Sequence, residues 1–225
     1  MQSLRRLRKI PQITFFMHIL GRWVLCFIGV FTMGFGIALS IRAGLGISPI
    51  SCLPYVLNQW LGISVGTMTF AVNIIFVALQ IAILRKNYPI YQLLQLPLLF
   101  VFSAAIDFSL WLLSGAVTDL YLLQFCMMLL SCFIIALGIF FLLKAELLMM
   151  PGDALVRAIA VVSQKEFGKV KVIFDCTLVA VAAVTSLCAL QCIVGIREGS
   201  LAAALLVGTI ARLLMKISRR GAPTD

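Results

Sequence analysis

The sequence predicts an all-α integral membrane protein with six transmembrane helices and two short re-entrant or interfacial helices, arranged as two inverted three-helix repeats. Three observations predict this class. Of the 225 residues, 63% are hydrophobic and only 12% are charged, which is too few to cover a water-soluble domain. Long apolar stretches alternate with short basic segments, as in multi-pass membrane proteins. An ungapped internal repeat relates the two halves of the chain.

Each matched position in the second half lies 102 residues after its counterpart in the first half. Small residues and prolines recur at one spacing, as Gly36, Ala43 and Pro49 and again as Gly138, Ala145 and Pro151. The same displacement matches residues of similar type without a gap: Arg42 with Lys144, Leu53 with Leu155, Gly66 with Gly168, and Asn73 with Asp175. It divides the chain into a basic N-terminal segment, two membrane repeats and a cytoplasmic C-terminal tail, at 1–15, 16–116, 117–217 and 218–225.

A membrane span needs about 20 mainly apolar residues. Six stretches meet this requirement: 16–41, 66–84, 93–115, 120–143, 171–193 and 199–217. Two shorter pieces, 49–61 and 151–163, follow the repeated prolines. Because proline is favoured at the first position of a helix, both pieces are predicted to be helices that begin near Pro49 and Pro151.

The basic residues set the predicted orientation. The positive-inside rule places Arg5 to Lys9, Arg85-Lys86, Lys165 to Lys171 and Lys216 to Arg220 in the cytoplasm. All four positions agree if the two short pieces do not cross the membrane, whereas eight crossings would turn both internal basic segments outwards. Six spans therefore fit better, with both termini cytoplasmic. Three spans in each copy then require the second copy to be inverted.

The starts of the two short helices are candidate binding positions. Ser48, before Pro49, and Asp153, after Pro151, can satisfy free backbone N–H groups there. If both helices dip into the membrane, their N-termini approach from opposite faces, each with about half a positive charge, and favour an anion. The alternative is that both are interfacial helices lying flat on the membrane.

Matched basic residues precede the two prolines. Arg42 and Lys144 either line one shared cavity or extend their charged ends to the membrane surface.

Three polar residues fall inside the predicted spans. Asn73 and Asp175 occupy matched positions and are either part of a substrate or proton pathway or a structural hydrogen bond or ion pair. Lys144 and Lys171 are candidate partners of Asp175, and Lys171 lies four residues before it on one helix face. Asp107 has no acidic counterpart in the second half, which makes it a candidate proton relay.

Several other activities are not expected. The seven cysteines form no CxxC pair and His18 is the only histidine, so no metal or other cofactor is predicted. Nothing resembles a nucleophile with its base, so no enzymatic activity is predicted. The net charge of +10 is concentrated at the ends of apolar stretches, which indicates membrane orientation rather than nucleic-acid binding. The expected partners are the lipid bilayer and a small polar or anionic solute, and the oligomeric state is left open.

Several motifs together resemble the YczE/YitT family of bacterial multi-pass membrane proteins over about residues 21–214. They are Ala38-Leu39-x-x-Arg42-Ala43-x-Leu45-Gly46-x-Ser48-Pro49-x-x-x-Leu53-Pro54, Pro151-Gly152-Asp153, Gly168-Lys169-Val170-Lys171-x-x-x-Asp175 and Arg197-Glu198-Gly199-Ser200. The resemblance implies a helical bundle in the bacterial cytoplasmic (inner) membrane. The family has no settled activity, so no site residue is carried over. Ser200 stands where the family motif has threonine.

Two hypotheses of function follow. The first is a small-solute transporter or permease with its site at the interface of the inverted repeats. The alternative is a non-transporting membrane regulator or assembly factor that acts through a protein partner, for which the basic cytoplasmic surface is the only support. A passive channel would need a continuous polar lining, which the sparse polar residues do not provide.

Overall fold

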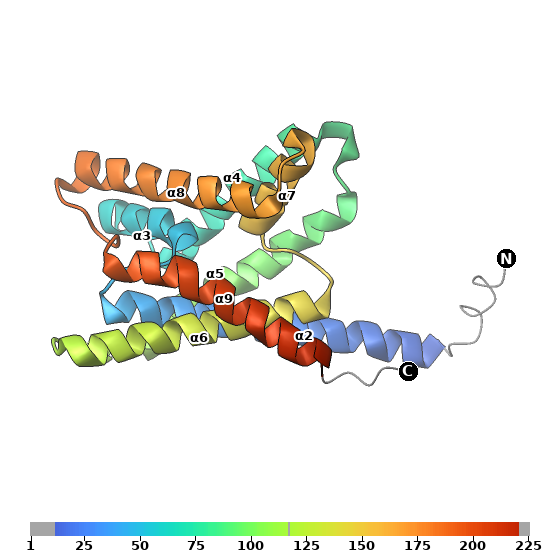
Figure 1. Cartoon of the computed structure of the whole chain (residues 1–225), viewed down its shortest axis with the longest axis horizontal. Helices are drawn as coiled ribbons and strands as arrows, with labels where there is room; N and C mark the ends of the chain where they lie inside the picture. Colours follow the sequence, from blue (N-terminus) through green and yellow to red (C-terminus); the bar gives the residue numbers. More distant parts are fainter. Residues whose placement is uncertain (1–11, 117, 221–225) are drawn as a thin grey trace.

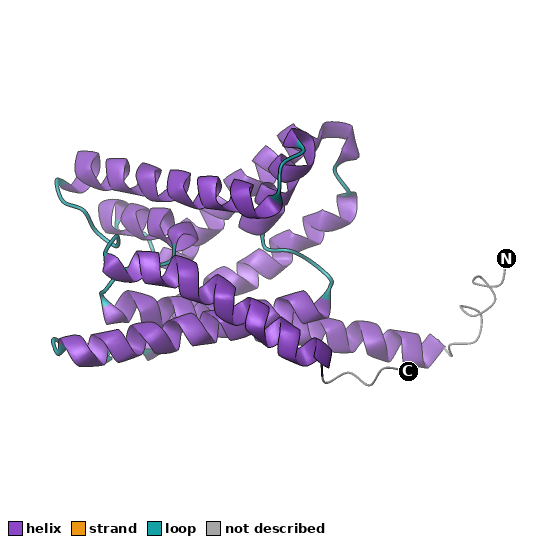
Figure 2. Ribbon diagram, in the orientation of Figure 1, coloured by secondary structure: helices purple, strands orange, loops and turns teal. Residues whose placement is uncertain are grey.

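The computed structural model describes residues 12–116 and 118–220, and none of these forms a β-strand. The first half contains α2 (Gln12–Ala43), α3 (Pro49–Leu61), α4 (Val65–Leu84), the 3-10 helices η2 (Arg85–Asn87) and η3 (Ile90–Leu94), and α5 (Gln95–Leu112). The second half contains α6 (Tyr121–Ala145), α7 (Pro151–Ser163), α8 (Phe167–Leu190) and α9 (Glu198–Arg220). Figure 2 shows this helical architecture. The basic residues Arg5 to Lys9 and the last five residues of the tail lie outside the described residues.

Five helical segments are long and apolar enough to cross a membrane: Leu20–Ala43, Val65–Asn87, Ile90–Leu112, Tyr121–Ala145 and Phe167–Leu190. They coincide with five of the six stretches predicted from the sequence. The sixth, 199–217, falls within α9, which is helical but is not among the five. Length and composition together therefore identify a multi-pass helical membrane protein.

The two short helices begin and end at the predicted residues. α3 and α7 each have 13 residues with a proline at the start. At about 20 Å they are shorter than the hydrocarbon core of about 30 Å. The residues that end them, Gly62 and Gln164, both have a left-handed backbone, with φ of 69° and 54°.

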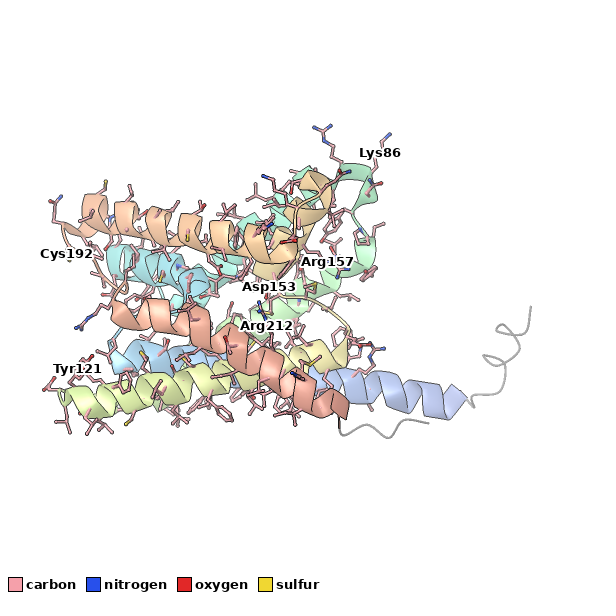
Figure 3. The ribbon with its side chains drawn as sticks, in the orientation of Figure 1. Lys86, Tyr121, Asp153, Arg157, Cys192 and Arg212 are labelled. Atoms are coloured by element: carbon pink, nitrogen blue, oxygen red, sulfur yellow. The ribbon has the colours of Figure 1, made fainter. Side chains whose placement is uncertain are left out.

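The bundle has two ends, which Figure 3 identifies by labelled side chains. The Tyr121 end carries the start of α6 and the turn after α8 at Cys192, and the Lys86 end carries the connection between α4 and α5. Figure 1 shows α2 beginning, and α9 finishing, towards the Lys86 end. We call these two regions the Tyr121 end and the Lys86 end.

Helices of the two halves exchange partners. α2 and α6 lie side by side and run in opposite directions (Figure 1). α3 packs on α8, and α7 packs on α4, so each short helix contacts the long helix that follows the other short helix. α5 packs on α2 and α9 on α6. The main hydrophobic core, which includes Val30, Leu99 and Ile106, lies among α2, α5, α6 and α9.

Candidate functional site

A second apolar cluster lies where α3, α4, α7 and α8 meet. It contains four pairs of residues whose members differ by 102 positions: Leu53 with Leu155, Leu57 with Ile159, Val72 with Phe174, and Phe76 with Leu178. The rings of Phe76 and Phe174 make an edge-to-face contact with 5.5 Å between their centroids. We call these eight residues the central cluster.

The first turns of α3 and α7 meet beside the central cluster. A Cβ added to Gly152 would overlap Ile50 Cδ1 and lie 3.3 Å from its Cγ1, and these two residues also differ by 102 positions. The helix starts at Pro49 and Pro151 therefore lie close together. Ser48 forms no side-chain cap of α3, and its Oγ instead donates a hydrogen bond to Ser51 Oγ at 3.2 Å.

Three of the sequence-predicted site residues form one charged cluster, which we define as Asp153, Lys171 and Asp175. The ammonium group of Lys171 lies 3.0 Å from Asp153 Oδ1 and 3.1 Å from Asp175 Oδ1. The side chains of Asp153, Lys171 and Asp175 are 39%, 29% and 22% exposed. Asp175 Oδ1 is shielded from solvent and accepts no well-aligned hydrogen bond. Its interaction with the Lys171 ammonium is therefore electrostatic.

The repeat places neutral residues at the three matching positions of the first half. Ser51, Thr69 and Asn73 correspond to Asp153, Lys171 and Asp175 at the displacement of 102, and each is only 5% exposed. Asn73 Nδ2 donates a hydrogen bond of 2.8 Å to Thr69 O within α4. The neutral set is therefore buried, whereas the charged cluster is partly open to solvent.

Asp107 joins two helices at the Tyr121 end. Its carboxylate accepts hydrogen bonds from Ser64 Oγ at 2.6 Å and from Gly66 N at 2.7 Å, at the start of α4. A carboxylate is favourable there because the free N–H groups and the helix dipole are positive. A Cβ on Gly66 would overlap Ser103 O of α5 and lie 2.6 Å from Asp107 Cγ, so α4 and α5 approach closely.

The matching positions of the second half make no such joint. Gly168 would have no atom within 4 Å of an added Cβ, and Thr209, the counterpart of Asp107, donates to Leu205 O of its own helix. Among the described residues, α8 and α9 make no packing contact comparable to that of α4 and α5.

A second contact between the two halves lies at the Tyr121 end. The loop after α2 meets the start of α9, where Ile47 N donates to Gly195 O at 3.1 Å and to Ser200 Oγ at 3.0 Å. Gly199 N donates to Leu45 O at 2.9 Å. The Arg197-Glu198-Gly199-Ser200 motif thus includes residues that link the start of α9 to the loop after α2.

Arg42 and Lys144 are not brought together. Arg42 Nη2 donates a hydrogen bond of 2.9 Å to Leu110 O near the end of α5. Lys144 is exposed, and its ammonium lies 5.7 Å from the ring centroid of Phe140. Matched positions in the sequence therefore have different surroundings at the two ends.

Sequence reasoning missed two buried glutamines. Gln80 is fully buried and its Nε2 donates to Pro151 O at 2.9 Å, which fixes the first turn of α7 against α4. Gln95 lies 3.5 Å from Gln80 and 3.3 Å from the Tyr88 hydroxyl. The signal that would have found them is a glutamine within an apolar span, because an unpaired amide is costly there.

An open hollow of about 510 Å³ lies beside α7 and the start of α8, with Met149, Arg157 and Phe167 among its lining residues. None of the residues predicted for the site lines it.

The helices and apolar spans define a multi-pass helical membrane protein. A family model described as a family of unknown function, DUF6198, matches residues 20–216, and the chain belongs to this family. No curated protein and no solved structure matched the chain.

Proposed function

We propose that the protein is a small-solute transporter built from two inverted copies, residues 16–116 and 117–217, with its site where the copies meet. The single observation that carries this proposal is the contact between Ile50 and Gly152, with the four matched pairs of the central cluster beside it. A residue touches its own repeat counterpart only near the axis that relates the two copies. The opposite directions of α2 and α6 support an axis that lies in the membrane plane, an arrangement that recurs in transporters.

The proposed orientation places the Lys86 end in the cytoplasm of a bacterial cell. Arg85, Lys86, Lys165 and Lys169 all belong to that end, as the positive-inside rule requires. In this arrangement α9 is the sixth span, and α3 and α7 are re-entrant helices whose N-termini meet inside the protein. The proposal also includes a distant relationship to the YczE/YitT family, on the motifs given above.

The same comparison assigns a state of the transport cycle. In the proposed orientation the Tyr121 end faces outwards, and there Asp107 and Ser200 link neighbouring elements, whereas the matching Gly168 makes no close approach to another helix. This difference supports the proposal that the structure corresponds to a cytoplasm-facing state. Exchange of these contacts between the two copies would produce the opposite state, because both copies share one framework.

The test is solute uptake by the purified protein reconstituted in lipid vesicles. A screen of small polar, anionic and cationic solutes should find one whose uptake depends on the protein. Asp175→Asn should abolish that uptake, and Lys144→Ala, which changes an exposed residue outside the charged cluster, should retain it. Absence of protein-dependent uptake of every solute by a correctly folded preparation would overturn the transport function.

A further inference from the structure

The open hollow beside α7 and the start of α8 carries two cations without acidic partners. Arg157 of α7 (Figure 3) and Lys165, which follows this helix, both line the hollow of about 510 Å³, and none of the described residues lining it is acidic. Among the described side chains, neither cation pairs with a carboxylate. Glu166, next to Lys165 in the chain, lies 3.2 Å from Lys169 instead. The hollow therefore has two positive charges that the described side chains do not neutralise.

The guanidinium of Arg157 has room for an anion. Asp153 lies one turn earlier on α7, but its carboxylate is 3.0 Å from the ammonium of Lys171. Arg157 Nη1 is 3.4 Å from the sulfur of Met149, which is a weak acceptor. An arginine within a membrane protein normally has an anionic or carbonyl partner, because an unpaired charge is costly there.

The walls of the same hollow are apolar. Val161 and Phe167 line it and are 64% and 43% exposed. Lipid chains surround such side chains more favourably than water does. A free inorganic anion would pair with the cations and leave these walls uncovered, whereas a phospholipid offers both a phosphate and an acyl chain.

The proposed course of α7 puts the hollow at the depth of lipid headgroups. The helix starts at Pro151, inside the protein, and runs towards the Lys86 end (Figure 1). At 1.5 Å per residue, an upright α7 places Arg157 about 9 Å and the end of the helix about 18 Å from that start. The hydrocarbon core extends about 15 Å from its midplane. Arg157 and Lys165 thus lie on the two sides of the boundary between acyl chains and headgroups.

The fold does not require cations at these positions. The first half has Tyr55 and Ile63 at the two matching places. A Cβ on Gly195 would lie 2.7 Å from Tyr55 Cδ1, and Ile47 N donates to Gly195 O at 3.1 Å, so the loop before α9 lies over Tyr55. A short helix of this fold can therefore pack without the two charges that the hollow contains.

We infer that the hollow binds an anionic phospholipid, whose phosphate pairs with Arg157 and Lys165 and whose acyl chain covers Val161 and Phe167. A guanidinium can hold a phosphate through two parallel hydrogen bonds, and basic hollows at the cytoplasmic side of membrane proteins suit such headgroups. The inference uses the depth that the proposed function gives α7, but lipid binding does not require transport.

The direct test is native mass spectrometry of the full-length protein released from micelles that contain phosphatidylglycerol and phosphatidylcholine with the same acyl chains. We expect one phosphatidylglycerol to be retained in preference to phosphatidylcholine. Arg157→Gln should weaken this binding about ten-fold and Lys165→Gln about five-fold. Arg157→Lys keeps the charge, loses the paired hydrogen bonds and should fall between Arg157→Gln and the wild type.

Two further variants separate the hollow from general attraction between charges. Lys169→Gln removes the same charge at the same end but outside the lining residues, and should leave the affinity unchanged. Val161→Asn changes the wall without changing the net charge and should weaken retention of the lipid. Equal retention of the two lipids, or equal losses in Lys169→Gln and Arg157→Gln, would overturn the inference.

Inorganic phosphate distinguishes a lipid from a free anion. Added at the same concentration as the lipid, it should not displace phosphatidylglycerol, because it cannot cover the apolar walls. Displacement by inorganic phosphate alone would overturn the lipid as the ligand of the hollow.

The outcome is also separable from that of the transport proposal. Preferential retention of phosphatidylglycerol by a protein that takes up no solute would support the lipid site and overturn transport. Protein-dependent uptake of a solute, without a preference for phosphatidylglycerol, would support transport and overturn the lipid site.

Discussion

The Tyr121 end and the Lys86 end of the bundle are built on one sequence framework and have opposite character. At the Tyr121 end, Asp107 joins α5 to the start of α4, and the corresponding polar set of the first half is neutral and buried. In the second half α8 and α9 make no comparable packing contact, and the positions that match the neutral set are charged and partly exposed. Only 17% of the α8 span is buried, against 39% of the α4 span.

The comparison shows how charge follows packing in a duplicated unit. Burying Asp153, Lys171 and Asp175 as deeply as their counterparts would remove three charges from water, at a cost that the ion pairs only partly offset. The packed copy therefore carries serine, threonine and asparagine, and the charges are confined to the copy that is open. If the two copies exchange contacts during transport, the second copy becomes tightly packed. The side chains of the charged cluster then need additional polar or charged partners.

The strongest test of this difference is one substitution at two matched glycines. Gly66→Val should destabilise the protein by about 3 kcal/mol, because its side chain would overlap Ser103 O and the Asp107 carboxylate. Gly168→Val should change stability little, since the space around that position is open. Thermal unfolding in lipid nanodiscs measures both. Equal effects at the two glycines would show that the ends are not packed differently.

Removing the Asp107 carboxylate should have the next largest effect. Asp107→Ala leaves Gly66 N without its acceptor and removes one of the two acceptors of Ser64 Oγ, the other being Thr67 Oγ1, and we expect this to cost about 2 kcal/mol. The matched Thr209→Ala removes a hydrogen bond within one helix and should cost much less. Asp107→Asn retains one acceptor oxygen and should fall between the two. Unfolding temperatures give the order of the three variants. An Asp107→Ala variant as stable as the wild type would contradict the contact assigned between α5 and the start of α4.

Local sequence features predicted the helices well. A proline and its spacing determine where α3 and α7 begin, and the length of an apolar run determines a span. The pair of Lys171 and Asp175 was also within reach, because residues four apart lie on one helix face. These properties depend on neighbours in the chain.

The missed features depend on how helices turn towards one another. The ion pair of Asp153 with Lys171 joins α7 to α8, and Asp107 caps a helix other than its own. Arg42 and Lys144 show the limit most clearly, since equal positions in the repeat have unlike surroundings. The proton relay suggested for Asp107 stays a prediction, and the contact that the sequence did not predict is its carboxylate at the start of α4.

A smaller effect is expected from the loop contact at the Tyr121 end. Ser200→Ala removes the acceptor of the Ile47 N–H and a donor to Gly195 O, and Ile47 N keeps its second partner, Gly195 O. We therefore expect a loss of about 1 kcal/mol. Ser200→Thr keeps the hydroxyl and should retain most of the stability. Hydrogen exchange of the Ile47 amide measures the contact directly, and unchanged protection in Ser200→Ala would contradict it.

The smallest effect concerns an ion pair at the Lys86 end that resembles the charged cluster only in composition. Glu166 and Lys169 lie 3.2 Å apart with side chains 75% and 73% exposed. Water and salt screen such a pair, so Lys169→Ala should change stability by about 0.3 kcal/mol or less. Lys171→Ala, two residues further along α8, leaves two partly buried carboxylates facing each other and should destabilise the protein measurably. Unfolding at low and high salt compares the two variants. If both behave alike, the cluster is an ordinary surface ion pair, and the distinction between charges at the rim and charges next to the central cluster is lost.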